Sequence, residues 1–351
     1  RPWIVIEDIA IGNPVWASGA HFAKAEKLGV QVALFPLLRG DLRVLDVSFT
    51  GVNLSIEEGP DGTNNYSFGD SQGSKEPGLL PPIERLLIRD VIINHQTADA
   101  GIRQYKIDEA RLWNIPGQPE RIEGKGSTKG MPFTILFTSG TASELSSPQN
   151  PWCVKLNING PEMSLNLTGR IVQAFKWDQG DYHITISATQ ADELETLFGV
   201  DFPTTGPLEL STKVNMAVGS FKVTDIAARV HGPSERPAIN ILQGEASGGL
   251  GETLRIALQG QYGDAPCTLR FVSTQPFQGI SQTTPWPIEA QLSIADAKLN
   301  VEGTLIPATV AERFEFDARL EGKTLSTLAQ LLDTELPQAG PYQLSFHTNI
   351  A

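Results

Sequence analysis

Five histidines, three aspartates and a glycine cluster are the residues whose types and spacing could support metal binding or catalysis. None of the histidines has a second histidine or cysteine at the spacing of metal ligands. The aspartates fall on different expected strands and turns, so we interpret them as solvated surface residues. The glycine cluster lacks the Lys-Ser/Thr pair and the helix of a phosphate-binding loop. The residues concerned are His21, His95, His183, His231, His347, Asp90, Asp99, Asp108, Gly248, Gly249 and Gly251.

The common catalytic signatures are also missing from the sequence. It contains no Gly-x-Ser-x-Gly elbow, no Walker loop and no dinucleotide-binding fingerprint. We therefore predict a protein with no catalytic residue, no bound metal and no cofactor. A hydrolase that uses a pair of carboxylates is the enzymatic alternative that the sequence leaves open.

The composition is that of a folded, turn-rich and acidic chain. Of the 351 residues, 40% are hydrophobic and 19% are charged, which is ordinary for a globular protein. The 33 glycines and 24 prolines indicate many turns and therefore many short strands. The net charge of −13 disfavours binding to nucleic acid and to an anionic membrane face.

No stretch of the sequence approaches the ~20 consecutive apolar residues of a membrane-spanning helix. The longest apolar run, residues 32–38, is interrupted by Pro36. The sequence starts at Arg1 without a methionine and passes directly into an expected strand. We therefore expect it to be part of a longer protein, with a signal or anchor upstream of Arg1.

Apolar and polar residues alternate with a period of two over much of the chain. Clear examples are residues 154–159, 163–171, 182–186, 254–258, 299–305 and 314–321. This alternation is typical of strands in antiparallel sheets that have one apolar face and one wet face. We predict a mainly β fold, an antiparallel sheet with a few short helices.

Helical spacing of apolar residues is confined to short segments. Leucines at this spacing predict helices over residues 324–335 and 192–199, and residues 20–28 are a third candidate. We expect the first of these helices to cover an edge of the sheet, with a gate for a ligand as the alternative. Residues 69–82 are rich in glycine, serine and proline and predict a linker or mobile loop.

The second half of the chain contains a repeat at an offset of 134 residues. Trp152 recurs as Trp286, and Gly169 recurs as Gly303. We divide the chain into an N-terminal β region (1–104), a first repeat (105–217) and a second repeat (218–351), with approximate boundaries, and we expect them to form one continuous sheet. A duplicated unit of this size favours an elongated array. Two tandem β domains with closed cores are the alternative.

The two cysteines leave a disulfide open. An oxidising compartment would allow Cys153 and Cys267 to pair. Against this pairing, the repeat aligns Cys153 with Pro287, so the fold does not require it.

Several motifs resemble the AsmA family in their order and spacing. Residues 9–14 (Ile-Ala-Ile-Gly-Asn-Pro) and 34–38 (Leu-Phe-Pro-Leu-Leu) are similar to the turn and the strand end of its N-terminal region. Residues 61–68 (Asp-Gly-Thr-Asn-Asn-Tyr-Ser-Phe) are similar to its hairpin, with Asn-Tyr in place of the usual Asn-Trp. Residues 336–342 (Leu-Pro-Gln-Ala-Gly-Pro-Tyr) are similar to its recurrent helix and turn. The resemblance extends over nearly the whole chain.

The resemblance implies a periplasmic protein of the Gram-negative envelope, anchored in the inner membrane by a helix upstream of Arg1. Larger members resemble bridge-like lipid-transfer proteins, in which a long curled β-sheet encloses an open apolar groove. The implied function is binding and transfer of phospholipid in support of the outer membrane. The implied partners are a phospholipid or other acyl lipid and proteins of the inner and outer membranes.

An apolar groove would solve the solvation problem of lipid transfer. At ~0.8 kcal/mol per methylene, two acyl chains of about 15 methylenes each face a cost on the order of 24 kcal/mol in water. The alternating apolar residues could line such a groove, or they could form an ordinary packed core in a scaffold or interaction module for envelope assembly. The candidate lining residues are Leu156, Ile158, Leu165, Leu167, Ile184, Ile186, Leu292, Ile294, Leu299, Val301, Phe314 and Phe316.

Overall fold

A computed structural model gives the fold, which is mainly β, with 74% strand and 6% helix. It describes residues 2–40, 42–57, 64–66, 83–97, 101–141, 151–172, 177–198, 206–231, 238–276, 286–306, 313–326, 329, 337 and 339–350. The predicted loop over residues 69–82 lies outside these residues. So does most of the predicted helix over residues 324–335.

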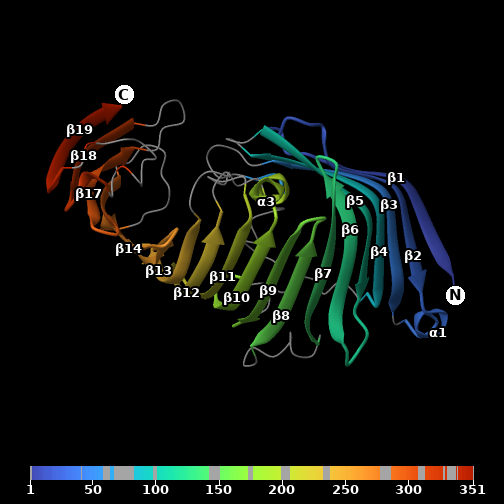
Figure 1. Ribbon diagram of the computed structural model, residues 1–351. Coiled ribbons are helices and arrows are strands. Elements are labelled where there is room, and N and C mark those ends of the chain that lie inside the picture. Colours follow the sequence, from blue (N-terminus) through green and yellow to red (C-terminus); the bar gives the residue numbers. More distant parts are fainter. Residues whose placement is uncertain are drawn as a thin grey trace. The chain divides into compact units, whose positions relative to one another are not determined.

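Nineteen strands belong to one sheet that is not closed on itself. They follow one another in chain order (Figure 1). The strands are β1 (Trp3–Gly12), β2 (His21–Val32), β3 (Val44–Glu57), β4 (Arg85–Thr97), β5 (Gly101–Trp113), β6 (Pro119–Thr128), β7 (Met131–Thr141), β8 (Trp152–Asn159), β9 (Met163–Ile171), β10 (Gly180–Ala188), β11 (Leu208–Ala217), β12 (Ser220–Val230), β13 (Ile239–Gly249), β14 (Glu252–Tyr262), β15 (Ala265–Pro276), β16 (Trp286–Ile294), β17 (Ala297–Ile306), β18 (Arg313–Gly322) and β19 (Tyr342–Ile350).

Among the strand pairs with a described register, all but one are antiparallel, as the alternation predicts. Strands β3 and β4 run parallel, with Phe49 opposite Ile88. This parallel pair is a departure from the predicted antiparallel sheet.

The chain forms two compact units. The first contains residues 1–166 and 196–200, and the second contains residues 167–195 and 201–351. Within each unit the consecutive strands follow a curve (Figure 1), so the sheet is curled in both. The predicted division into an N-terminal region and two repeats is a different one and stays a prediction.

The strand registers recur at the predicted offset of 134 residues. In the β7–β8 pair Ser139 lies opposite Val154, and in the β15–β16 pair Ser273 lies opposite Ile288. The irregularity on β5 between Ile107 and Glu109 reappears on β13 between Ile241 and Gln243. The pair β10–β11 has the same register as β18–β19.

The matching strand registers lie within residues 105–217 of the first repeat, and they begin at Ile239 in the second repeat. Strand β12, which the predicted second repeat includes, precedes the matched part. The repeat-like architecture predicted from the sequence is therefore present at the level of strand pairing.

In the part of the chain that the structure describes, two labelled helices interrupt the strands. Helix α3 (Ala191–Phe198) confirms the helix predicted over residues 192–199. Helix α1 (Leu34–Leu37) is a single turn beside Pro36. The helix considered for residues 20–28 is wrong, because β2 occupies this segment and pairs with β1 on one side and β3 on the other. Pairing on both sides outweighs the helix propensity of its alanine, lysine and glutamate residues.

Candidate functional site

Six leucines form a continuous row across β14–β19 in the second unit. Each lies directly opposite the next in the strand registers, so all six side chains share one face of the sheet. Five are half-buried and the last, on β19, is 41% exposed. We call Leu258, Leu269, Leu292, Leu299, Leu320 and Leu344 the leucine row.

A second apolar row lies beside the leucine row on the same face. Its members are two residues away along each strand, and residues two apart share a face. They also oppose one another in register. This second row comprises Ile256, Phe271, Ala290, Val301, Ala318 and Phe346. Together the rows make an apolar band two residues wide across six strands.

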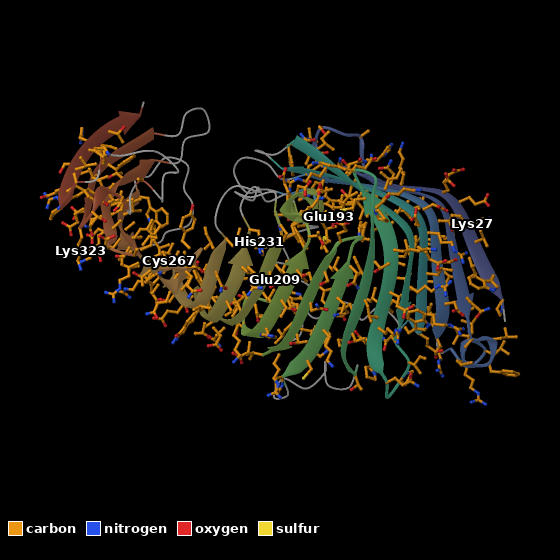
Figure 2. All side chains as sticks on the ribbon, in the orientation of Figure 1. Lys27, Glu193, Glu209, His231, Cys267 and Lys323 are labelled. Carbon is orange, nitrogen blue, oxygen red and sulfur yellow. The ribbon has the colours of Figure 1, made fainter. Side chains whose placement is uncertain are left out.

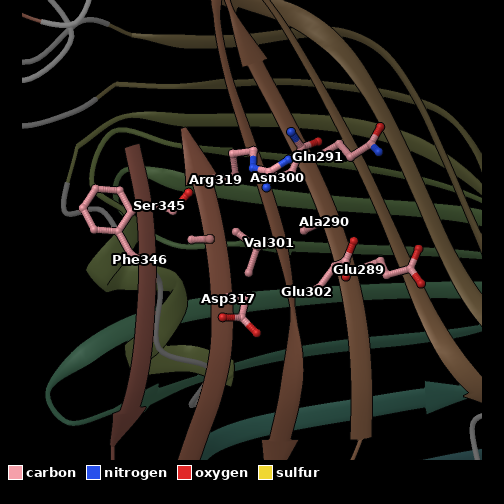
Figure 3. A pocket seen from close by; sticks show the side chains of 11 residues that line it. Glu289, Ala290, Gln291, Asn300, Val301, Glu302, Asp317, Arg319, Ser345 and Phe346 are labelled. Atoms are coloured by element: carbon pink, nitrogen blue, oxygen red, sulfur yellow. The ribbon is translucent and has the colours of Figure 1, made fainter. Parts of the chain in front are cut away.

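The opposite face of the same strands is polar. There Gln291 lies opposite Asn300, and Asn300 lies opposite Arg319. A hollow of about 430 Å³ lies over these strands, and both kinds of residue line it: polar ones such as Asn300, Glu302 and Asp317, and the second-row residues Ala290, Val301, Ala318 and Phe346 (Figure 3). Side chains project from both faces along the strands (Figure 2). The segment is therefore apolar on one face and solvated on the other.

In the first repeat, the candidate lining residues are half-buried at the middle of their strands. Leu156 and Ile158 on β8 show this intermediate exposure, while Trp152 and Val154 at the start of the same strand are 3% and 1% exposed. On β10, Ile184 and Ile186 are likewise half-buried between the buried Tyr182 and Ala188. On β9, Leu165 and Leu167 are half-buried between the buried Met163 and Ile171. The apolar face is thus covered at the strand ends and partly open between them.

All the predicted lining residues that the structure describes are half-buried. In the second repeat this holds for Leu292, Ile294, Leu299, Val301 and Phe316. The side chain of Phe314 lies outside the described residues. The register adds residues that the sequence analysis did not select, namely Leu258, Leu269, Leu320 and Leu344 of the leucine row. Two of these four, Leu258 and Leu320, belong to alternating segments of the sequence, and only the strand register shows that all four extend one row.

Two residues of the sequence motifs, Asn13 of residues 9–14 and Asn65 of residues 61–68, meet in a buried polar cluster in the first unit. Asn65 is 2% exposed, and its Oδ1 accepts a hydrogen bond from the Glu57 N–H at 2.9 Å. Its Nδ2 donates to Asn13 Oδ1 at 3.0 Å and to the Ser55 carbonyl at 2.6 Å. The Ser18 N–H donates to Glu57 Oε2 at 2.7 Å. This cluster ties the N-terminal turn to the end of β3, so these motif residues support the fold.

The environment of Glu57 keeps its carboxylate ionised. Burial by itself raises the pKa of Glu57, but the hydrogen bonds from Ser18 and Ser55 outweigh it. The net effect holds the pKa below its ordinary value of 4.5. Glu57 is therefore an ionised acceptor within the cluster at neutral pH, and it has its donors in place.

The other candidates for chemistry lie apart from one another. Cys153 and Cys267 are both free thiols, one exposed and one half-buried, and burial raises the pKa of Cys267. The ring of His347 lies 3.0 Å from Asp317 in an exposed pair. Asp90 and Asp108 lie on β4 and β5, while Asp99 is outside the described residues. No three His, Cys, Asp or Glu side chains come together as a metal site within the residues that the structure describes.

Comparison with known proteins gives no match to this chain among family models, curated proteins or solved structures. Neither helix in the described part of the chain is long and apolar enough to cross a bilayer.

Proposed function

We propose that this protein is a non-enzymatic lipid-binding module that holds acyl chains along the apolar band and hands them on to a membrane or partner. The observation that carries this proposal is the leucine row, six apolar side chains in register on one face and only half-buried. Partly open apolar surface of this extent marks a binding site for an apolar partner. The paired strands leave no free backbone hydrogen-bonding groups in the middle of the sheet, which suits a hydrocarbon ligand.

The dimensions of the band suit an acyl chain. With strands ~4.8 Å apart, the six strands of the leucine row span roughly 24 Å. An acyl chain covers roughly 15 Å in a bilayer, half of the ~30 Å hydrocarbon core. One chain therefore fits along the row, and the adjacent second row offers a track for another. Each methylene moved from water to this surface gains ~0.8 kcal/mol.

The resemblance to the AsmA family supports a setting for this activity. We propose that the protein works in the periplasm of a Gram-negative cell, where phospholipid must cross between the inner and outer membranes. The net charge of −13 is consistent with a solvated outer face and an apolar contact with lipid. Proteins of the two membranes would then be the donors and acceptors.

Photo-crosslinking from the two faces of one strand tests the proposal. A photoreactive residue at Val301 lies in the apolar band, whereas one at the neighbouring Asn300 lies on the polar face. After incubation with phosphatidylethanolamine vesicles and irradiation, mass spectrometry should find lipid attached at position 301 and several-fold less at position 300. Leu167 and Thr168 provide the same paired test on β9.

Equal labelling of both faces, or no lipid at either position in a folded chain, would overturn lipid binding. A chain that yields no lipid but captures an envelope protein through the same face would support the alternative, a β scaffold or interaction module for envelope assembly.

A further inference from the structure

Four exposed apolar side chains of the second unit lie in the connections between strands β9–β14. Val172 and Trp177, in the β9–β10 connection, are 57% and 46% exposed. Val218 in the β11–β12 turn and Leu250 in the β13–β14 turn are 74% and 69% exposed. Because β10–β14 pair antiparallel with their neighbours, all three connections lie at the same edge of the sheet. We call these four residues the apolar rim.

Turn geometry does not require apolar residues at the rim. Val218-Gly219 and Leu250-Gly251 form two-residue turns between paired strands. In each turn the glycine has a positive φ, 72° at Gly219 and 80° at Gly251. Turns of this kind favour glycine at the second position and accept most residues at the first. The exposed valine and leucine at the first positions therefore call for another reason.

The opposite edge of the same unit has polar turns. The two-residue β14–β15 and β16–β17 turns lie there and contain Gly263-Asp264 and Ala295-Asp296. Asp264 is exposed, and Asp296 Oδ2 accepts a hydrogen bond from the Lys323 N–H at 3.0 Å. The described turns thus suit water at this edge, whereas the rim presents apolar surface at the other.

The apolar rim is continuous with the apolar band. Leu254 on β14 lies two residues from Ile256 of the second row, so both side chains share the apolar face. Phe221 on β12 lies beside Leu254, because a Cβ on Gly248 would meet each of these two side chains at 3.2 Å. Both side chains are half-buried. Apolar side chains therefore lead from the band to the rim.

The backbone of the rim suits contact with hydrocarbon. The Leu250 N–H donates to the Gly219 carbonyl at 2.6 Å, which joins the two neighbouring turns. The Trp177 carbonyl accepts a hydrogen bond from the Tyr182 hydroxyl at 2.8 Å. Because a backbone group without a partner is costly in a bilayer, these bonds favour a lipid surface as the occupant. Tryptophan is also enriched where proteins meet the interface of a bilayer.

Charge and size indicate which kind of surface fits the rim. Among the described residues of the three connections, Asp178 is the one charged side chain, so no basic group there attracts anionic lipid. A stable protein interface takes about 20–30 residues on each side, whereas the rim offers four apolar side chains. Both features favour a zwitterionic bilayer over an anionic one and over a protein partner.

From these observations we propose that the apolar rim docks on a zwitterionic phospholipid bilayer. An acyl chain then passes from the bilayer over Leu254 onto the apolar band. This inference deepens the proposed function, because it names the edge of the sheet at which lipid enters. The passage of lipid rests on the proposed function, whereas the docking does not.

Fluorescent labels at the two edges test the docking. In a chain whose own cysteines are replaced (Cys153→Ser, Cys267→Ser), an environment-sensitive dye is attached at Val218→Cys or, as the matched control at the opposite edge, at Asp264→Cys. Vesicles of phosphatidylethanolamine and phosphatidylcholine should raise the emission of the dye at position 218 several-fold and shift it to the blue. The dye at position 264 should change little.

Three results of the labelling would overturn the docking. The first is an equal response, or none, at both positions. The second is a response at position 218 that requires anionic lipid. The third is a response to added unlabelled chain instead of vesicles, which would assign the rim to a contact between two copies.

The route of the lipid is tested by Leu250→Ser, with Leu242→Ser as its control. Leu242 on β13 is 61% exposed and lies outside the rim, so both variants remove an exposed leucine. Leu250→Ser should lower vesicle binding in a flotation assay several-fold, and with it the lipid cross-linked to a photoreactive residue at Val301. Leu242→Ser should change neither quantity.

The two readouts separate the rim from the band. Vesicle binding that Leu250→Ser leaves unchanged would overturn the docking. Cross-linking at Val301 that survives a several-fold loss of vesicle binding would overturn the route over the rim. A dye response at position 218 without any lipid at Val301 would support the docking and overturn the proposed function.

Discussion

The first repeat, β5–β11, and the matched part of the second repeat, β13–β19, share most strand registers from β5 to β8 and in the β10–β11 pair, but they bury their apolar faces to different degrees. Val154, Met163 and Ile171 in the first repeat are 1%, 4% and 0% exposed. The equivalent of Val154 is Ile288, which is half-buried. Tyr182 is buried, whereas its equivalent Phe316 is half-buried. Identical pairing therefore does not fix how deeply a face is covered.

Helix α3 belongs to the first repeat and follows β10 directly, and its Ala191 and Leu194 are completely buried. Its last turn belongs to the first unit, where the Tyr105 hydroxyl donates to the Leu197 carbonyl at 3.4 Å. Strand register thus sets the position of the apolar rows, while their burial differs between the two repeats.

Truncation of the repeated tryptophans should give the largest difference between the two copies. Each stacks against a phenylalanine at the same offset, Phe137 with Trp152 at 6.3 Å and Phe271 with Trp286 at 6.0 Å between ring centroids. Trp152 is 3% exposed and Trp286 is half-buried. We expect Trp152→Ala to lower the free energy of unfolding by about 3–5 kcal/mol, and Trp286→Ala by roughly half as much.

Urea denaturation followed by circular dichroism measures both effects. Cys153→Ser is the control, because this exposed neighbour of Trp152 should change stability by no more than about 0.5 kcal/mol. If the two tryptophan variants lost the same unfolding free energy, the difference in burial between Trp152 and Trp286 would have no effect on stability. That result would contradict the difference proposed between the repeats.

Local alternation predicted most of the strands, because apolar and polar residues alternate within short stretches such as Val154–Ile158. The separation of 134 residues between the two repeats was predictable, because a glycine and a tryptophan recur at equivalent positions where side chains pack closely. Burial was not predictable, because the exposure of a strand residue such as Leu156 depends on what packs against the sheet, and local alternation does not encode that. The parallel β3–β4 pair and the positive φ of Asp8 are also set by pairing with other strands, which single-sequence periodicity does not encode.

The repeated pair of glycines, Gly169 and Gly303, gives the next test of the comparison. A Cβ on Gly303 would lie 2.4 Å from the Glu315 carbonyl oxygen, which is backbone and cannot move aside easily. A Cβ on Gly169 would meet the Tyr182 ring at 2.6 Å and the Asp181 carbonyl oxygen at 2.9 Å. We expect Gly303→Ala to cost about 1–3 kcal/mol through overpacking, and Gly169→Ala to cost less because the ring can shift.

Thermal unfolding of the two glycine variants ranks these costs. Gly117→Ala is not a suitable control, because its positive φ adds strain of its own, whereas Gly12→Ala has no atom near the added Cβ. Gly12→Ala should leave the melting temperature nearly unchanged. A larger loss from Gly169→Ala than from Gly303→Ala would show that the first repeat is the more rigid copy at this position.

The smallest effect should come from a charged residue that the repeats do not share. Glu120 accepts a hydrogen bond from the Ser139 hydroxyl at 3.4 Å, and the equivalent position in the second repeat is Leu254. Burial raises the pKa of Glu120 above its ordinary value of 4.5, and the bond from Ser139 opposes this only in part. The folded chain therefore holds this proton more tightly than the unfolded chain does.

The sign of the pH dependence follows from that difference. The stabilisation from protonated Glu120 is fully present below 4.5 and is lost as the pH rises through the raised folded pKa. Replacing the acid with the residue of the second repeat, Glu120→Leu, removes this loss. We expect the variant to gain roughly 0.5 kcal/mol of unfolding free energy over the natural chain at neutral pH, and less below 4.5.

Urea denaturation at both pH values measures this gain. The reciprocal change, Leu254→Glu, should bring a pH-dependent loss of stability to the second repeat. A gain from Glu120→Leu that stays constant with pH would show that the carboxyl does not titrate within the folded sheet, and that the repeats differ at this position only in packing.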